Sequence, residues 1–189
     1  MPSNFIFIDR NVDYKPILQQ VLDNPEDWKA VHGYASTAGK KTPSGFLPLV
    51  MGVLKDPGGD IRDSDYQRPT PMWYKYTEVR KWLESWGIKQ TARSAFFGLP
   101  PGGQVRRHID DGKYYLTRDR YHLSLQGTYR YTVGDEVHII EPGTFFWFDN
   151  KLEHESINIS EVERISFVFD VIHSKHNPQH KVKEQSYVG

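Results

Sequence analysis

The sequence predicts a mainly β protein with an antiparallel barrel or jelly-roll core and α-helices in its first half. Aromatic residues make up 14% of the 189 residues, and they gather with β-branched residues in the second half, as strands favour. Short apolar segments alternate there with turn signals, which is typical of all-β domains. The chain carries neither an internal repeat nor a dividing linker, so we expect one domain over residues 1–189.

The first 90 residues are expected to form a support region of helices and loops. Residues 5–8 have the apolar character of a short strand. Two apolar stripes with helical spacing follow, the first ended by Asn24-Pro25 and the second capped by Gly87. The stripes are Ile17, Leu18, Val21 and Leu22 in the first helix and Val79, Trp82, Leu83 and Trp86 in the second. Residues 33–71 are rich in Gly, Pro, Ser and Asp and are predicted to be mostly loop.

Residues 91–173 are expected to form the β core, and residues 174–189 a C-terminal tail. Apolar and β-branched patterns predict five strands, at residues 91–99, 121–133, 137–140, 144–148 and 164–172. Turn signals separate them at Pro100-Pro101-Gly102-Gly103, Gly134-Asp135, Pro142-Gly143 and Asp149-Asn150. Many short strands with such turns between them predict the barrel or jelly roll.

Composition and charge exclude several classes of function. Lys plus Arg and Asp plus Glu each number 24, so the formal net charge is zero and nothing indicates a nucleic-acid partner or an anionic membrane surface. The absence of cysteine excludes disulfides, thiolate-bound zinc and thiol catalysis. No signal peptide or membrane span is recognisable, so we expect a cytoplasmic protein, whose oligomeric state the sequence leaves open.

Two histidines and an aspartate form a candidate metal site. His108 and Asp110 are two residues apart and therefore share one face of an extended segment, whereas Asp111 points to the other face. His154 is the candidate third ligand, from elsewhere in the fold. Two histidines and one carboxylate hold non-haem Fe(II) on one face and leave three positions open. The His-x-Asp pair alone is a weak signal, because a turn with a surface ion pair gives the same pattern.

Arg164 begins an expected strand whose two faces differ. Arg164, Ser166 and Asp170 fall on one face, and an aromatic and aliphatic face lies opposite. If the apolar face packs against an outer shell, Arg164 points into the barrel, where a buried arginine needs an anionic partner. The co-substrate 2-oxoglutarate, a dicarboxylate, would supply that partner through its far carboxylate. The alternative partner is a protein carboxylate such as Asp170.

Arg120 and His122 share one face of another expected strand. A positive, hydrogen-donating pair of this kind, pointing inward, would suit the second carboxylate of the same ligand. The alternative for His122 is a core histidine that is satisfied by hydrogen bonds.

Short stretches between about residues 93 and 173 match a known family when they are taken in order. They are Leu99-Pro100-Pro101-Gly102, Arg120-Tyr121-His122-Leu123-Ser124-Leu125, Glu141-Pro142-Gly143, Phe148-Asp149-Asn150, Glu153-His154-Glu155 and Arg164 with Phe169-Asp170-Val171. Together they resemble the aspartyl/asparaginyl β-hydroxylase family of 2-oxoglutarate-dependent oxygenases, whose relatives include hydroxylases of free proline. The resemblance implies a double-stranded β-helix, which is a jelly-roll variant related to cupins, with helices packed outside.

The resemblance also implies the chemistry: an Fe(II)- and 2-oxoglutarate-dependent enzyme that uses O2 for hydroxylation and releases succinate and CO2. It implies that His108, Asp110 and His154 bind iron, that Arg164 binds the distal carboxylate of 2-oxoglutarate, and that Arg120 and His122 support the carboxylate beside the metal. Some family members assist the distal carboxylate with a serine eleven positions before the first iron ligand. Phe97 stands there in this chain, so Ser166 is the expected substitute. The presence of Asp110 favours hydroxylation over halogenation.

The substrate is expected to be a free amino acid or a residue within a peptide or protein. Arg106 shares the face of His108 and could pair with a substrate carboxylate, although a solvated charge like that of Arg107 is the simpler alternative. Tyr114 and Tyr115, with the loop of residues 33–71, are candidates for a lid.

Two competing hypotheses belong to other classes. A non-catalytic jelly-roll protein would bind metal without 2-oxoglutarate turnover, and a cupin-type metal protein would not need Arg164. In the tail, His173, His176 and His180 have a spacing compatible with zinc, with a mobile tail as the alternative.

Overall fold

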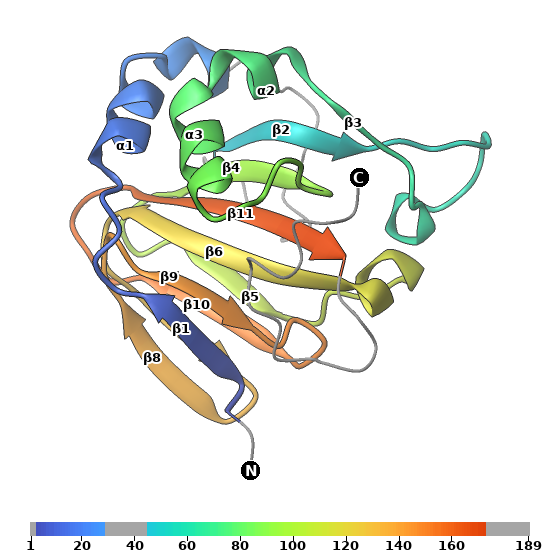
Figure 1. The fold of residues 1–189 in the computed structure, drawn as a ribbon. Helices are drawn as coiled ribbons and strands as arrows, with labels where there is room; N and C mark the ends of the chain where they lie inside the picture. Colours follow the sequence, from blue (N-terminus) through green and yellow to red (C-terminus); the bar gives the residue numbers. More distant parts are fainter. Residues whose placement is uncertain (1–2, 29–44, 173–189) are drawn as a thin grey trace.

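The computed structural model describes residues 3–28 and 45–172 of the chain (Figure 1). The strands are β1 (Phe5–Asp9), β2 (Phe46–Gly52), β3 (Gln67–Pro69), β4 (Ser94–Leu99), β5 (Gln104–His108), β6 (Arg118–Gln126), β7 (Tyr129–Val133), β8 (Glu136–Ile140), β9 (Phe145–Phe148), β10 (His154–Asn158) and β11 (Arg164–Ile172). The α-helices are α1 (Lys15–Leu22), α2 (Pro71–Lys75) and α3 (Thr77–Ser85), and the 3-10 helices are η1 (Pro25–Trp28), η2 (Ile61–Asp63) and η3 (Lys113–Thr117).

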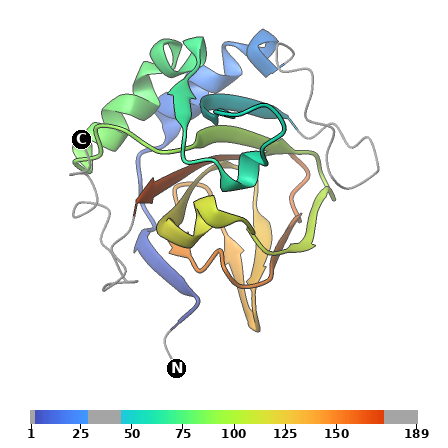
Figure 2. The ribbon, with the colours of Figure 1, turned by 90° about the vertical axis from the view of Figure 1, so that its right-hand side faces the viewer.

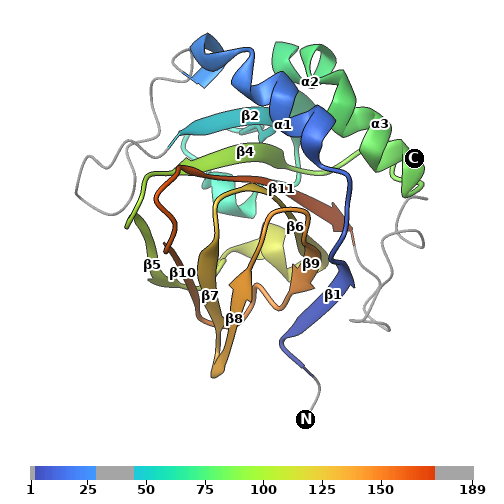
Figure 3. The same ribbon diagram turned by 90° about the vertical axis from the view of Figure 1, so that its left-hand side faces the viewer.

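The strands form two antiparallel sheets that face each other. A seven-stranded sheet has the order β1-β9-β6-β11-β4-β2-β3, and a four-stranded sheet has the order β5-β10-β7-β8. Figure 3 shows the four-stranded sheet on one side of the larger sheet and the α-helices on the other side. Aromatic side chains such as Phe146, Phe148 and Tyr131 fill the space between the sheets. This arrangement confirms the predicted mainly β, jelly-roll core.

The α-helices cover the outer face of the seven-stranded sheet, where the larger hydrophobic core lies. Ile165, Phe167 and Phe169 of β11 point into this core, together with Val79 and Leu83 of α3. Because side chains alternate along β11, Arg164, Ser166 and the other residues of its second face point toward the four-stranded sheet, as the sequence predicted. The apolar face is fixed by the helices, so the polar face of β11 is available for a site between the sheets.

Two expected elements differ from the structure. The strand predicted at 121–133 is interrupted and becomes β6 and β7, because Gly127 turns the chain with a φ of +75°. A Cβ at this glycine would lie 3.0 Å from the backbone of Arg164, so a larger residue does not fit. The segment 33–71, predicted as mostly loop, contains β2, η2 and β3 among its described residues. Pro48 has no backbone N–H to donate and therefore interrupts the hydrogen bonding of β2. The proline content of this segment was one reason to predict a loop.

The end of the barrel nearest the metal-site candidates is bordered by η2 and η3, which lie side by side (Figure 2). Gly112 leads into η3 with a φ of +106°, and a Cβ there would lie 2.5 Å from the Arg62 carbonyl oxygen. Tyr114 of η3, a lid candidate, is fully buried and donates a hydrogen bond to Asp170, and the lid stays a prediction. No helix in the described part of the chain is long and apolar enough to span a membrane.

Candidate metal centre

The structure brings His108, Asp110 and His154 together beside the ends of β5 and β10, with His108 exposed and His154 buried. His108 ends β5 and pairs directly with His154, the first residue of β10. The Nε2 atoms of His108 and His154 lie 3.8 Å and 4.0 Å from the same Oδ1 atom of Asp110. One potential ligand atom from each residue lies within 4.8 Å of the others, so the cluster could hold a metal ion. Sequence alternation had placed the first two residues on one face; strand pairing supplies the third.

Both imidazoles are oriented by backbone carbonyls. Nδ1 of His108 lies 2.7 Å from the Arg106 carbonyl oxygen, and Nδ1 of His154 lies 2.9 Å from that of Leu152. An Nδ1–H that donates to a carbonyl leaves the Nε2 lone pair for a metal. Burial lowers the pKa of His154 to about 4, so its imidazole is neutral near pH 7. The donor set and its orientation therefore fit a divalent metal such as Fe(II).

The Asp110 carboxylate is held so that one oxygen faces the histidines. Its Oδ2 accepts hydrogen bonds from Arg120 Nη1 at 2.7 Å and from Asn150 Nδ2 at 3.2 Å. Only Oδ1 remains directed at both Nε2 atoms. Asp111 instead forms an exposed ion pair with Arg62 at 3.0 Å, which excludes it as a member of the cluster in this conformation.

Arg120 joins Asp110 to a second buried carboxylate, Asp170 of β11. The two residues are direct cross-strand partners, and Arg120 donates to both carboxylate oxygens of Asp170, at 2.8 Å and 2.9 Å. The Tyr114 hydroxyl donates to the same carboxylate at 3.1 Å. The sequence had offered Asp170 as an alternative partner of Arg164; the structure pairs it with Arg120 instead.

Arg164 is buried without a carboxylate partner in the part of the chain that the structure describes. Its side chain is 3% exposed, donates to the Ser156 hydroxyl at 2.9 Å and lies over the Tyr129 ring at 4.8 Å. Ser156 is two residues after His154 on β10, so Arg164 lies close to the metal cluster. Sequence reasoning missed Ser156 and Tyr129. Alternation from His154 could have identified Ser156, whereas the Tyr129 contact depends on strand pairing.

Other polar groups near Arg164 are also buried and unsatisfied. His122 is 4% exposed, and burial and the Arg164 charge lower its pKa well below the ordinary value. Its Nδ1 atom and the Ser166 hydroxyl lack hydrogen-bond partners among the described residues. The described residues thus supply no partner for Nδ1, and the two hypotheses for His122, a ligand-binding or a core histidine, stay predictions. Buried polar groups without partners are the exception in folded proteins, so these groups are available to a bound water, ion or ligand.

The remaining candidates lie at the rim or beyond the described residues. Arg106 is exposed, and only its carbonyl oxygen, next to His108, contributes to the cluster. Arg107, expected to be a solvated charge, pairs with Glu153 at 2.9 Å. The tail histidines at positions 173, 176 and 180 lie outside the described residues.

Fold and cluster together define a jelly-roll protein with a His-Asp-His site between its sheets. The sequence model of the aspartyl/asparaginyl β-hydroxylase family matches residues 11–174, and the chain therefore belongs to this family. The match is wider than the expected 93–173 and includes most of the helical region. Membership indicates a hydroxylase that uses a metal, for which the cluster is the candidate centre. No curated protein sequence shows a significant match.

Similar solved structures include cupins. The Schizosaccharomyces pombe Cnp3 cupin domain is 13% identical, with a TM-score of 0.39, and the match covers 45% of this chain and 58% of that one. The protein TT1209 from Thermus thermophilus is 20% identical, with a TM-score of 0.36 over 43% of this chain and 73% of that one. A Thermotoga maritima protein described as a predicted oxalate decarboxylase is 15% identical, with a TM-score of 0.38 over 50% of this chain and 74% of that one.

Proposed function

We propose that the protein is an Fe(II)- and 2-oxoglutarate-dependent dioxygenase that hydroxylates an unactivated C–H bond of an amino acid, free or within a peptide or protein. The observation that carries this proposal is Arg164, a buried guanidinium near the His-Asp-His cluster with no carboxylate partner among the described residues. A dicarboxylate that binds the metal at one end would neutralise Arg164 at its other end.

Different residues around the cluster would bind the metal and the co-substrate. His108, Asp110 and His154 would hold the iron. Arg164 with the Ser156 and Ser166 hydroxyls would bind the distal carboxylate, while His122 is placed to donate to the ligand from β6. Bound Fe(II), 2-oxoglutarate and O2 together supply the chemistry by which a C–H bond becomes C–OH and 2-oxoglutarate becomes succinate and CO2.

For Arg120 we propose a positioning role, in addition to the support of the ligand carboxylate that the resemblance implied. Its guanidinium already binds two protein carboxylates, and one of them is the metal-binding candidate Asp110. By holding Oδ2, Arg120 would leave Oδ1 of Asp110 as the oxygen that binds a metal. Asp110 then completes the three protein ligands, which favours hydroxylation over halogenation because no ligand position is left for a halide.

The test is an anaerobic titration of the metal-free protein with Fe(II) and then with 2-oxoglutarate, in which the visible metal-to-ligand charge-transfer band is recorded. We expect the band in the wild type and its loss in Asp110→Ala. In Arg164→Met, a much higher 2-oxoglutarate concentration should be needed for the band to form. Arg130→Met is the matched control, because Arg130 is exposed on β7. A 2-oxo acid that lacks the distal carboxylate should bind the wild type and Arg164→Met with similar affinity.

Two outcomes would contradict the proposal. Fe(II) binding without the band would favour a cupin-type or non-catalytic metal protein that does not use 2-oxoglutarate. A band of equal strength in Arg164→Met at limiting 2-oxoglutarate would show that another residue holds the distal carboxylate.

A further inference from the structure

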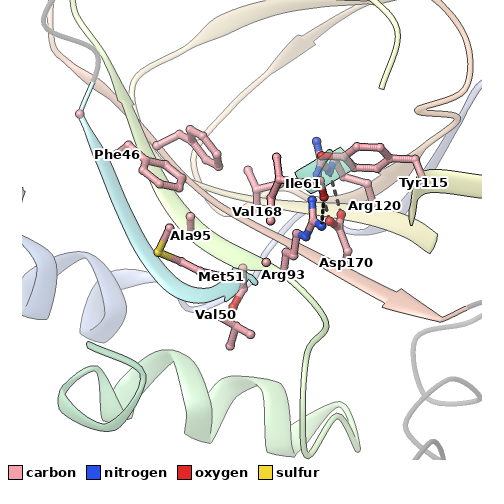
Figure 4. A pocket seen from close by; sticks show the side chains of 14 residues that line it. Phe46, Val50, Met51, Ile61, Arg93, Ala95, Tyr115, Arg120, Val168 and Asp170 are labelled. Atoms are coloured by element: carbon pink, nitrogen blue, oxygen red, sulfur yellow. Dashed lines mark hydrogen bonds and ion pairs between the residues drawn. The ribbon is translucent and has the colours of Figure 1, made fainter. Parts of the chain in front are cut away.

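A cavity of about 280 Å³ lies on the inner face of β2, β4 and β11, and Arg120 joins its polar end to the His-Asp-His cluster. Arg120 lines this cavity and also donates to Asp110, so a molecule in the cavity would lie within one side chain of the cluster. Figure 4 shows Phe46 at one end of the cavity and Arg120, Asp170 and Tyr115 at the other. Its volume is close to the lower limit of small-molecule sites, which span roughly 300–1,000 Å³.

Arg93 is a fixed cation at the polar end of the cavity. Its guanidinium lies over the Tyr114 ring at 3.8 Å, and its opposite side packs on Gly52, where a Cβ would be 2.7 Å from Nε. Nη2 donates to the carbonyl oxygens of Ile61 and Ser64. These contacts orient the group but leave its charge unneutralised, since Arg93 has no ion pair among residues 3–28 and 45–172. Nη1 has no hydrogen bond to a described residue, so its donors are available to a ligand.

The polar end offers donors rather than acceptors. Both oxygens of Asp170 accept hydrogen bonds from Arg120, one of them also from Tyr114, and the residue is 1% exposed. Asp170 is thus unable to receive a cationic group without breaking these bonds. Arg93 and the unused N–H groups of Arg120 remain, and a planar guanidinium suits a carboxylate. The polar end therefore fits an anionic group.

The other end of the cavity is aromatic and apolar. The Phe46 and Phe97 rings lie 5.0 Å apart, and Phe97 remains 36% exposed although it lies on a buried sheet face. Met51, Ala95 and Val168 continue the apolar surface toward the charged end. Positions 93 and 97 are four residues apart, which is roughly 13 Å along an extended strand, so the cavity accommodates a long or bulky apolar group.

We infer that this cavity is the substrate site and that it selects a carboxylic acid with a bulky apolar body, such as an apolar amino acid. Arg93 binds the carboxylate, and Phe46 and Phe97 bind the apolar side chain. This inference rests on the proposed function, because it takes the adjacent cluster as the reacting centre. The cavity is separate from the site proposed for 2-oxoglutarate, since Arg164 faces Ser156 on the second sheet and does not line the cavity. The two arginines thus bind two different carboxylates.

Binding without turnover tests the inference. The full-length protein is loaded with Mn(II) and 2-oxoglutarate without O2 and titrated in a calorimeter with L-leucine, L-methionine, L-phenylalanine and L-tryptophan. The matched probes are the amide of each amino acid, which lacks the carboxylate, and L-aspartate, which lacks the apolar body. The same titrations on metal-free protein measure the cavity independently of the cluster. We expect at least one apolar amino acid to bind about 10- to 100-fold more tightly than its amide, as expected for a charge-assisted hydrogen bond.

Variants assign this preference to residues. Arg93→Met should abolish the preference for acid over amide and leave 2-oxoglutarate binding unchanged, whereas Arg93→Lys should retain part of it. Phe97→Ala should weaken the acid and its amide alike, by about tenfold. Arg130→Met and Ile139→Ala are the controls, because both residues are exposed on the second sheet. A thermal unfolding curve of each variant shows whether it is folded.

The outcomes separate the two proposals. If 2-oxoglutarate binds but no apolar acid is preferred over its amide or over L-aspartate, the substrate inference is overturned and the proposed function stands. If Arg93→Met weakens 2-oxoglutarate instead, Arg93 holds the co-substrate and the inference is also overturned. If 2-oxoglutarate does not bind, the proposed function fails, and a preference for apolar acids in the metal-free protein would still support the cavity as a carboxylate site.

Discussion

Arg120 and Arg164 lie on the same side of the seven-stranded sheet and have opposite electrostatic surroundings. Arg120 is bound by Asp110 and Asp170, so its charge is neutralised within the protein. Arg164 is more deeply buried, and its guanidinium interacts with the Ser156 hydroxyl and the face of Tyr129 rather than with a carboxylate of the described residues. The first arginine is thus part of the structure that holds the metal cluster. The second has no carboxylate partner among the described residues, so under the proposed function it is the ligand-binding arginine and Arg120 is the positioning one.

The largest expected effect comes from Arg120→Met, because it leaves two carboxylates without their cation. Breaking a buried ion pair by removing one partner costs about 3–5 kcal/mol, so we expect a loss of that size in the free energy of unfolding. Urea denaturation followed by circular dichroism measures it. The double variant Arg120→Met with Asp170→Leu should recover part of the loss. A loss below about 1 kcal/mol in the single variant would show that the network contributes little.

Arg164→Met should have the opposite pattern, with a large effect on ligand binding and a small one on stability. It removes a buried charge that lacks a carboxylate partner, so the free energy of unfolding should change by less than about 1 kcal/mol or rise. The dissociation constant of 2-oxoglutarate should rise about 10- to 100-fold, as measured by calorimetry with Mn(II). A loss of stability as large as that of Arg120→Met would remove the distinction between the two arginines.

His122 should make stability depend on pH, since burial and the neighbouring Arg164 keep its pKa well below the ordinary value. Below about pH 6.5 the unfolded chain gains a proton that the folded protein excludes, so stability is present above this pH and is lost as the pH falls. One such group contributes a slope of up to about 1.4 kcal/mol per pH unit. Unfolding of the wild type and of His122→Gln at pH 8 and pH 5 measures the difference. Equal slopes would show that His122 is protonated when folded.

The smallest effect is expected for Asp111→Asn, which tests the choice between the two adjacent aspartates. Asp111 is exposed and, among the described residues, pairs with Arg62, so the free energy of unfolding should change by about 0.5 kcal/mol or less. Metal affinity should remain unchanged, in contrast to Asp110→Asn. Calorimetry with Mn(II) compares the two variants. Weaker metal binding in Asp111→Asn would mean that this carboxylate reaches the metal in the loaded protein.

Local patterns predicted much of the second half of the fold. β11 begins and ends where its alternation predicts, because its apolar face is buried by helices along its length. β5 was not predicted as a strand, because all five of its residues are exposed and carry no apolar alternation. β2 and β3 were missed for a related reason: proline and glycine around them favour a loop. Pairing of β2 with β4, and of β3 with β2, holds them in the sheet. An exposed or proline-interrupted strand exists through its neighbours rather than through its own pattern.

The sequence by itself determined which residues share a face: His108 with Asp110, and Arg164 with Ser166 and Asp170. Only the tertiary structure decided which of these residues meet. Asp170 pairs with Arg120 because the register of β6 on β11 places them opposite each other, while Arg164 is six residues away, roughly 20 Å along the strand. Strand pairing likewise places His154 beside His108, and it places Arg93 and Phe46 around one cavity. Side-chain alternation is a local property of the backbone, but contact between strands depends on register, which the whole packed core sets.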